Sequence, residues 1–348
     1  MIYRFKDIHT GKAKIVLLFL LLAVFLLVVA VYAEETDRES KEGYGIAVMR
    51  IRRGLENHEE SVDVSDLSIT PDMLGRIFSD AVKDAPYLFY VSNNLSYTYR
   101  SGGYVVAVKP TYTMEKEESQ EAIAYCREEI KKMAALASPC ESDLERLIFA
   151  HDLICQRFSY DLSLESNNMY SFLKSGKGTC QGYTWTYMAL LRELGLECRY
   201  VASDTVMHIW LAVRIDGEWY HSDVTWDDPP GNENGCEYKR AHILFSDEKA
   251  ERDGYIDRYC SDNIKCENKL YDGENFTSIL PFCIQSGDLD HDEKVDLYDL
   301  LLLRHYLQRA KETERKICCA CADIDRDLCV DETDIVYIRR ILLENISP

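Results

Sequence analysis

The chain has 348 residues, which is long enough for two domains and a sizeable core. Its composition is globular, with 47% hydrophobic residues and no low-complexity tract, and this excludes a disordered or fibrous chain. The formal net charge of −20 at pH 7 argues against nucleic acid and anionic membrane surfaces as partners.

The N-terminus predicts a targeting segment. Four basic residues precede an unbroken apolar run over residues 15–31. Val31 and Ala33 then place small residues at the −3 and −1 positions of a cleavage site. Residues 1–33 are therefore predicted to be a signal peptide. An uncleaved anchor is the alternative, because the run is long for a signal peptide, and membrane attachment is expected only in that case.

Residues 34–140 predict an α/β extension. Thr70 and Pro71 provide an N-cap and a proline at the first position of a helix. The expected elements are helices over residues 45–55, 71–83 and 115–136 and strands over 87–91, 95–100 and 104–108. No catalytic chemistry is visible in this extension, and we expect it to be structural and to shape a substrate cleft.

Residues 141–275 predict a separate catalytic core. Its first helix opens with Ser142 and Glu145, which are spaced as a capping box, and is expected to run to about residue 158. A short helix is expected over residues 170–173, a strand over 197–202 and a last strand over 241–245.

A single cysteine stands at a predicted helix start within this core. Cys180 follows a glycine-flanked turn, and apolar residues at helical spacing follow it until Gly195. A thiol at a helix N-terminus lies at the positive end of the helix dipole and near free backbone N–H groups. Both favour the nucleophilic thiolate. Alone, this pattern leaves open a catalytic thiol, a packed thiol or a disulfide partner.

A predicted β-hairpin brings two further residues together. The segment HIWLAVRIDGEWYHSDVTWDD is predicted to form two strands. They are joined by Asp216 and Gly217, a dipeptide typical of a type I′ turn. In that register His208 lies opposite Thr225, and His208 and Asp223 share one face as diagonal neighbours. A thiol, an imidazole and an orienting carboxylate are the groups that thiol acyl transfer needs.

Together these motifs resemble the transglutaminase-like superfamily, in particular its bacterial, secreted, papain-like branch. The resemblance rests on GxCxGY at a helix start and on HxW followed by DGxWYHxDxTWDD, and it runs from about Leu144 to Asp228. It implies that Cys180 is the nucleophile, His208 the general base and acid, and Asp223 the residue that orients His208. The implied fold is α+β, with the cysteine-bearing helix packed on an antiparallel sheet that carries the histidine and the aspartate.

The resemblance implies a secreted thiol acyl-transfer enzyme acting on peptide or protein amides, with no cofactor for the chemistry. We expect a backbone N–H at Cys180 to form half of the oxyanion hole. Hydrolysis by a cysteine peptidase is the leading expectation. The alternatives are cross-linking as a protein-glutamine gamma-glutamyltransferase and a catalytically silent binding domain. His221 and His242 are interpreted as strand histidines rather than metal ligands, since no ligand cluster accompanies them.

Residues 288–299 and 323–334 are internal repeats, DLDHDEKVDLYD and DIDRDLCVDETD. Each has aspartate at the side-chain ligand positions of an EF-hand-type calcium loop, and position seven supplies a backbone carbonyl. Each loop runs into an apolar helix. Glu293 and Leu328 replace the glycine usual at position six. The expected ligands of two calcium ions are Asp288, Asp290, Asp292, Lys294, Asp296, Asp299, Asp323, Asp325, Asp327, Cys329, Asp331 and Asp334.

The tandem of loop and helix resembles a dockerin, a module that attaches extracellular enzymes to cohesin domains of a cellulosome scaffold. The resemblance covers residues 287–343, so we predict a small all-α calcium-binding domain over residues 287–348 after a linker at 276–286. A cohesin is the implied partner, and a cell-surface cellulosome is the implied location. The pairs at positions ten and eleven, Leu297-Tyr298 and Glu332-Thr333, differ between the copies and leave the cohesin type open.

The 13 cysteines fit an oxidising compartment. If Cys180 stays a thiol, an even number remains for disulfides, although their connectivity does not follow from sequence. For the cluster near the second loop, disulfides or packing are favoured over zinc because no CxxC pair is present. That cluster consists of Cys318, Cys319, Cys321 and Cys329.

Overall fold

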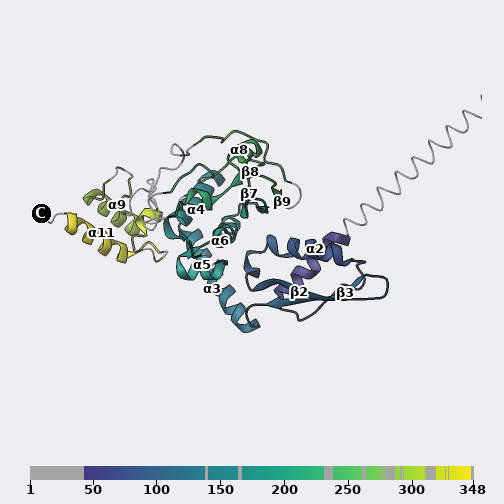
Figure 1. Cartoon of the computed structure of the whole chain (residues 1–348). Coiled ribbons are helices and arrows are strands. Elements are labelled where there is room, and N and C mark those ends of the chain that lie inside the picture. The colour runs from purple at the N-terminus through teal and green to yellow at the C-terminus, as the bar shows by residue number, and fades with distance from the viewer. Residues whose placement is uncertain are drawn as a thin grey trace, which may run out of the picture. The chain divides into compact units, whose positions relative to one another are not determined.

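The structure, a computed structural model, divides into two compact units, whose described residues lie within 43–81 and 93–111 and within 82–92 and 112–345 (Figure 1). The predicted signal peptide, all but two residues of the predicted linker, and Glu293 and Leu328 lie outside the described residues. Among those described, no helix is long and apolar enough to cross a membrane. The described residues are 43–137, 140–163, 167–230, 238–260, 264–274, 276, 279, 287–290, 292, 294–309, 319–325, 327 and 329–345.

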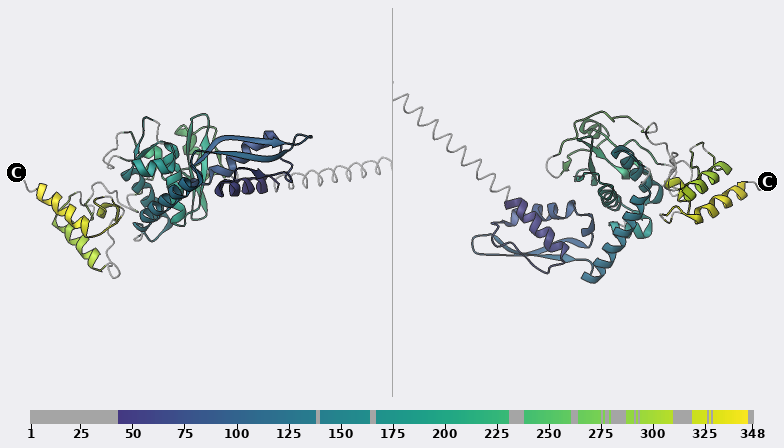
Figure 2. Two further views of the ribbon diagram at one scale, coloured as in Figure 1. Left: turned by 90° about the horizontal axis from the view of Figure 1, so that it is seen from below. Right: turned by 180° about the vertical axis from the view of Figure 1, so that it is seen from behind.

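The first unit is a small α/β layer, and the helix predicted over residues 115–136 belongs to the second unit. A helix over residues 43–56 and α2 (Pro71–Lys83) bury apolar side chains, among them Ile51 and Ile77. The sheet has the order β1-β3-β2, formed by β1 (Val62–Asp63), β2 (Val91–Tyr99) and β3 (Val105–Tyr112). Figure 2 shows the arm formed by β2 and β3.

The strand predicted over residues 87–91 is wrong in most of its length. A 3-10 turn, η1 (Pro86–Leu88), occupies it, and β2 begins only at Val91. Pro86 stands at the start of this turn, where its fixed φ and missing N–H are tolerated. The ring of Phe89 then stacks on Tyr170 at 5.9 Å, so the apolar segment is buried without being a strand.

Four helices of the second unit precede its main sheet. They are α3 (Lys116–Ala135), α4 (Asp143–Arg157), α5 (Met169–Ser175) and α6 (Cys180–Glu193). The predicted capping box at α4 is confirmed: Ser142 accepts from the N–H of Glu145, and the Glu145 side chain accepts from the N–H of Ser142. Side chains of α4 and α6 are almost entirely buried over their central turns, which makes these helices the core.

The main sheet is antiparallel and has the order β8-β7-β6-β9. Its strands are β6 (Cys198–Ser203), β7 (His208–Ile215), β8 (Glu218–Ser222) and β9 (Tyr259–Cys260). The type I′ turn is confirmed, because Asp216 and Gly217 have φ of 51° and 86°. The predicted register is also confirmed, since Ile215 pairs with Glu218.

Two expectations about the end of this sheet are wrong. β8 stops at Ser222 because Asp223 caps a one-turn helix, α7 (Val224–Asp227), so Thr225 is helical and does not face His208 from a strand. The strand predicted over residues 241–245 is reduced to a single bridge between His221 and Phe245. The carboxylate of Asp227 accepts from backbone N–H groups of this segment that a strand would need for pairing.

The C-terminal repeats form a helical pair. Their helices α9 (Leu297–Arg309) and α11 (Glu332–Asn345) follow the two loops, and α10 (Cys319–Ala322) is a single turn before the second loop. The described part of the molecule thus has an α+β core and an all-α C-terminal segment, in agreement with the predicted fold class. The exact domain limits stay predictions.

Candidate functional site

Cys180 is the first residue of α6, and Thr179 is the N-cap. The loop before it is held by a short parallel pair, β4 (Ser159–Tyr160) with β5 (Lys177–Gly178). Gly182 allows α5 to approach, because a Cβ at this position would lie 2.9 Å from the ring of Phe172. The glycines of the GxCxGY motif therefore position the helix start, and the thiol lies at its positive end.

His208 lies between Cys180 and Asp223. Its Nε2 is 2.7 Å from Asp223 Oδ2, and the side chain of Cys180 hydrogen bonds to the same imidazole. Because Nε2 faces the carboxylate, Nδ1 is the nitrogen left for the thiol. The structure therefore brings together the three residues that the sequence selects, from the start of α6, the start of β7 and the end of β8.

Asp223 is held from both of its oxygens. Its Oδ1 accepts from the backbone N–H groups of Thr225 at 2.9 Å and Trp226 at 3.3 Å, which makes it the N-cap of α7. Its Oδ2 accepts from the hydroxyl of Tyr255 at 2.7 Å as well as from His208. The carboxylate is buried, with 1% exposure, so these donors replace water.

Burial and charge act in opposite directions on this pair. Burial disfavours the imidazolium, but the Asp223 carboxylate and the hydrogen bonds to Asp223 and Cys180 raise the pKa of His208 to about 10. Burial also disfavours the charged Asp223, yet His208 and Tyr255 hold the pKa of this carboxyl below its usual value. The imidazole is therefore protonated and the carboxylate ionised at neutral pH.

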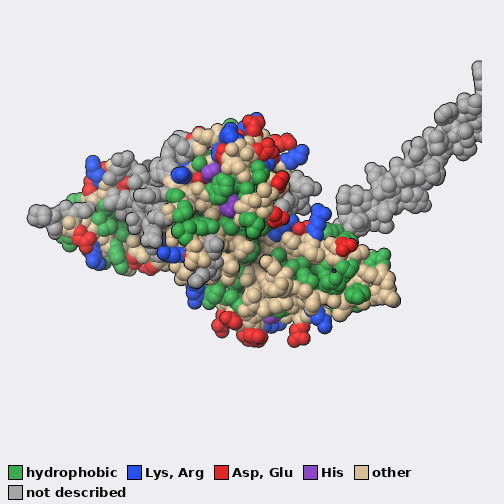
Figure 3. Space-filling model, in the orientation of Figure 1, with side chains coloured by type: hydrophobic (Ala, Val, Ile, Leu, Met, Phe, Trp, Pro, Cys, Tyr) green, Lys and Arg blue, Asp and Glu red, His purple; other side chains and the backbone are tan. Residues whose placement is uncertain are grey.

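Aromatic rings enclose the imidazole. Trp210 and Trp226 lie nearly parallel to His208, with ring centroids at 5.6 and 5.4 Å. Trp226 is 37% exposed, so it is the part of this cage that reaches solvent. On the face shown in Figure 3, histidine side chains reach the surface among hydrophobic ones.

A second buried histidine near α7 is held between two carboxylates. His151 contacts Asp152 through Nδ1 at 3.1 Å and Asp227 through Nε2 at 3.2 Å. Arg240 pairs with Asp152, and His242 Nδ1 lies 2.8 Å from Asp227. This network fixes the last residue of α7 and thereby supports Asp223 at the other end of the helix.

The interpretation of two histidines as strand residues holds for one of them. His221 lies on β8, where its Nδ1 accepts from Trp210 Nε1 at 3.1 Å and its Nε2 contacts Asp247 at 3.1 Å. His242 is not on a strand, because its segment is bound to Asp227 instead.

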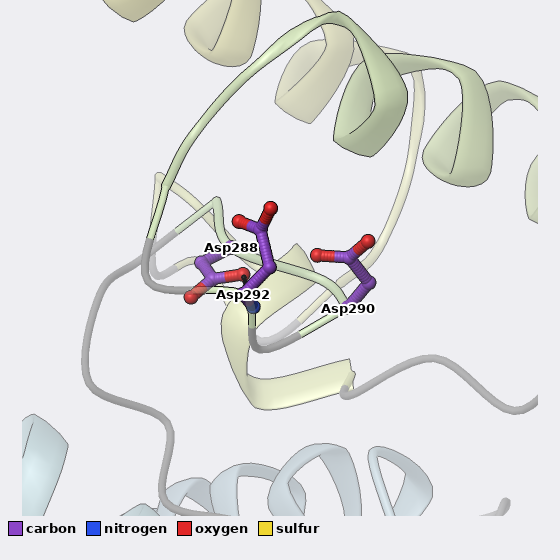
Figure 4. Close-up of side chains that lie close together, drawn as sticks. All are labelled: Asp288, Asp290 and Asp292. Carbon is purple, nitrogen blue, oxygen red and sulfur yellow. Dashed lines mark hydrogen bonds between the residues drawn. The ribbon is translucent and has the colours of Figure 1, made fainter.

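The C-terminal loops gather carboxylates, of which Asp323 also pairs with Arg157 of α4 at 2.9 Å. The carboxylate oxygens of Asp288, Asp290 and Asp292 lie within 4.8 Å of one another (Figure 4). The equivalent residues of the second loop, Asp323, Asp325 and Asp327, form a second cluster of the same kind. Oxygen ligands in this density suit a divalent cation such as calcium.

The other predicted ligand positions mainly brace the loops. At position twelve, Asp299 accepts from the N–H groups of Leu289 and Asp296, both at 2.8 Å. Its counterpart Asp334 accepts from Ile324 at 2.7 Å and Asp331 at 2.8 Å. At position nine, Asp296 and Asp331 each accept from the N–H two residues later, and at position seven Lys294 and Cys329 donate their N–H groups to the position-five aspartate.

Family models match the two parts of the chain that carry these features. Residues 130–224 match the model of the transglutaminase-like superfamily, and residues 286–343 match that of the dockerin type I domain. The chain carries a transglutaminase-like segment and a dockerin type I domain. Dockerin type I domains bind calcium, and they imply a cohesin partner and an extracellular cellulosome.

Comparisons with individual proteins find only distant similarity. A structure described as a TGase is 15% identical, covers 45% of this chain and 49% of its own, and has a TM-score of 0.28. A candidate cysteine protease of Cytophaga hutchinsonii is 14% identical, with coverages of 38% and 61% and a TM-score of 0.25. A candidate protease of Parabacteroides distasonis is 14% identical, with coverages of 38% and 35% and a TM-score of 0.23. The chain thus spans about half the length of the first of these structures. No curated protein matches it in sequence.

The even number of cysteines left after Cys180 would allow all of them to form disulfides, but they do not all pair. Cys126 and Cys198 are buried thiols outside any disulfide, and Cys180 and Cys329 are also thiols. Cys321, near the second dockerin loop, is disulfide-bonded, in agreement with the preference for disulfides over zinc there.

Sequence reasoning missed Tyr255 and the network around Asp227. Tyr255 lies 32 positions beyond Asp223 in a polar segment with scattered aromatics, and no motif singles it out. Asp227 stands in the sequence as the first of two adjacent aspartates, and only the fold shows that two histidines contact it.

Proposed function

We propose that the protein is a secreted thiol acyl-transfer enzyme, a transglutaminase-like cysteine peptidase, attached to a cellulosome scaffold through a dockerin–cohesin interaction. The observation that carries the proposal is the shared imidazole of His208, which binds Asp223 at 2.7 Å and Cys180 on its other side. Nucleophile, base and orienting carboxylate stand in this relation in thiol acyl transfer.

The proposed reaction begins with the thiol of Cys180. An imidazolium beside the sulfur favours the thiolate. The sulfur attacks the carbonyl carbon of an amide, a C–S bond forms, and the carbonyl electrons move to oxygen. The proton held by His208 passes to the leaving nitrogen, the C–N bond breaks, and an amine departs from a thioester.

A second half-reaction regenerates the thiol. Water attacks the thioester and gives a proton to His208, the C–S bond breaks, and a carboxylic acid leaves. The N–H groups in the first turn of α6 have no partner within the helix, so the backbone N–H of Cys180 is available to stabilise the oxyanion in both steps. Asp223 holds the imidazole in register and balances its charge.

The C-terminal domain supplies attachment in this proposal. Two calcium ions would be held by the aspartate clusters of the two loops, with Asp288 and Asp323 at their first positions. Calcium would compensate the repulsion within each cluster and let the domain bind a cohesin outside the cell.

The test of the catalytic part is a turnover assay on mixed peptides, with and without an added primary amine. We expect new carboxyl termini in both conditions and their loss in Cys180→Ala. Incorporation of the amine instead of water would identify the enzyme as a transamidase. A wild-type protein that neither turns over peptides nor is labelled at Cys180 by a thiol-directed electrophile would contradict the proposal and favour a silent binding domain.

A further inference from the structure

Tyr255 is positioned by the segment that follows α8 (Asp247–Arg252). Gly254 has a φ of +97°, which turns the chain back, and the N–H of Tyr255 then donates to the carbonyl of Ala250 at 2.8 Å. A side chain other than glycine is strained at this φ. The turn sends Tyr255 inward, where it is fully buried.

The ring of Tyr255 packs within the aromatic cage of the site. Its centroid lies 4.1 Å from Trp226, 4.7 Å from Trp210 and 5.2 Å from Phe245. These contacts leave the hydroxyl in one place, 2.7 Å from Asp223 Oδ2. A buried hydroxyl held this closely is a fixed donor rather than a chance neighbour.

We propose that Tyr255 is a positioning residue that fixes the Asp223 carboxylate, and through it the imidazole of His208, for acyl transfer by Cys180. The inference rests on the proposed function. Oδ2 accepts from Tyr255 and His208 at the same distance of 2.7 Å, while Oδ1 is held by the backbone of α7. With all four donors in place the carboxylate of Asp223 cannot rotate. Its Oδ2 therefore stays in one position and orientation relative to His208 Nε2.

Tyr255 lies outside residues 130–224, the segment that matches the transglutaminase-like family model. The chain therefore completes its site with a residue from a later segment.

The donor also affects the acid side of the pH dependence. A hydrogen bond to the charged form stabilises it, so its loss raises the pKa of Asp223. The two histidines whose charges act on Asp223, His208 and His242, stay in place in a variant that removes only this hydroxyl. His221 and the buried thiol of Cys155 are affected by the charge of Asp223, and they also stay in place.

The test compares two buried tyrosines in the full chain. Tyr255→Phe removes the hydroxyl on Asp223, and Tyr187→Phe removes one that lies 3.1 Å from Ser222 Oγ. Both rings are fully buried, so both variants should lose comparable thermal stability. We expect kcat to fall roughly ten- to hundredfold in Tyr255→Phe only, since hydrogen bonds to charged groups are the strong ones, with KM little changed.

The second measurement needs no substrate. The rate at which iodoacetamide alkylates Cys180 is measured as a function of pH. The acid limb of this rate profile should move to higher pH in Tyr255→Phe. Replacing Tyr255 by 3-fluorotyrosine keeps the ring and strengthens the donor, so the limb should move the other way. This isosteric variant also decides the matter if Tyr255→Phe fails to fold.

The outcomes separate the two proposals. If Cys180 of the wild type is alkylated and the wild type turns over peptides, but Tyr255→Phe and Tyr187→Phe behave alike, Tyr255 is only a packing residue and the inference is wrong. If the wild-type thiol is neither alkylated nor active, the proposed function itself fails. Opposite shifts of the acid limb in the two Tyr255 variants would support the positioning role.

Discussion

The aspartates of the core and those of the dockerin loops are both crowded, but their partners differ. Asp223 and Asp227 lie at the two ends of one helical turn, and each contacts at least one histidine. Asp288, Asp290 and Asp292 each have a carboxylate oxygen within 4.8 Å of the others, and the equivalent residues of the second loop repeat the arrangement. Histidines of the core pair with its carboxylates. In the loops the carboxylates gather with one another, and Asp323 also pairs with Arg157 of α4.

The pKa values of the two groups shift in opposite directions. Burial disfavours the charged form everywhere, but the histidines hold the pKa of Asp223 and Asp227 below the usual range. Burial raises the pKa of Asp299 and Asp334, and the neighbouring loop carboxylates raise it further. The same residue type is therefore held in its charged form by histidines in the core and is harder to ionise in the loops.

The largest expected effect comes from removing the thiol of Cys180. Cys180→Ala should abolish peptide turnover while the unfolding curve stays close to wild type, because the deleted group is the nucleophile and is only half-buried. Cys126→Ala removes a buried thiol of α3, far in sequence from the site, and should stay active. Near wild-type turnover in Cys180→Ala would contradict the assignment.

Asp223→Asn should reduce kcat roughly a thousandfold or more, by analogy with triads whose orienting carboxylate is removed. The amide oxygen can still accept from the backbone N–H groups of Thr225 and Trp226, so α7 should remain capped. Steady-state kinetics together with thermal unfolding measure this. A loss of only a few-fold would mean that another group orients His208.

Asp227→Asn tests whether the other end of α7 is structural. Removing one partner of a buried charge network costs about 3 kcal/mol or more. Burial disfavours the imidazolium of His151, but Asp152 and Asp227 raise its pKa to about 9. Unfolding free energies from denaturant titration should therefore fall sharply, while kcat per folded molecule falls less than in Asp223→Asn. The reverse order of effects would place Asp227 in the catalytic machinery.

Calcium should act on the loops and leave the core unchanged. Calorimetry on the full chain should detect two ions, and saturation at about a hundredfold above Kd would stabilise the dockerin domain by about 2.7 kcal/mol for each ion. Asp288→Ala combined with Asp323→Ala should remove calcium binding and capture by a cohesin, with peptide turnover unchanged. Equal helix content and equal protease resistance with calcium and with chelator would contradict this.

The pH dependence of the core pair tests whether His208 and Asp223 are charged partners. The pKa of His208 is raised to about 10 from an ordinary value of about 6.5, so its stabilisation is complete below the ordinary value and is lost as pH rises through about 10. On the acid side it is lost as pH falls through the lowered pKa of Asp223. The difference in unfolding free energy between wild type and His208→Gln should shrink as pH rises through about 10. A constant difference would show that the two residues are not charged partners.

The sequence alone determined those features that depend on neighbouring residues. The turn at Asp216 and Gly217 sets the hairpin register, and side-chain alternation then places His208 and Asp223 on one face. Ser142 and Glu145 cap α4 through contacts three residues apart. The two aspartate clusters are equally local, because each comes from one short loop of the chain.

Only the tertiary structure decided which distant groups complete the site. Tyr255 reaches Asp223 because Gly254 turns the chain and aromatic rings hold the side chain. The strand predicted over residues 241–245 fails because the carboxylate of Asp227 captures its N–H groups. Such choices depend on burial, where an unpaired polar group is costly and takes whichever partner the fold brings near, and neither propensity nor spacing along the chain specifies that partner.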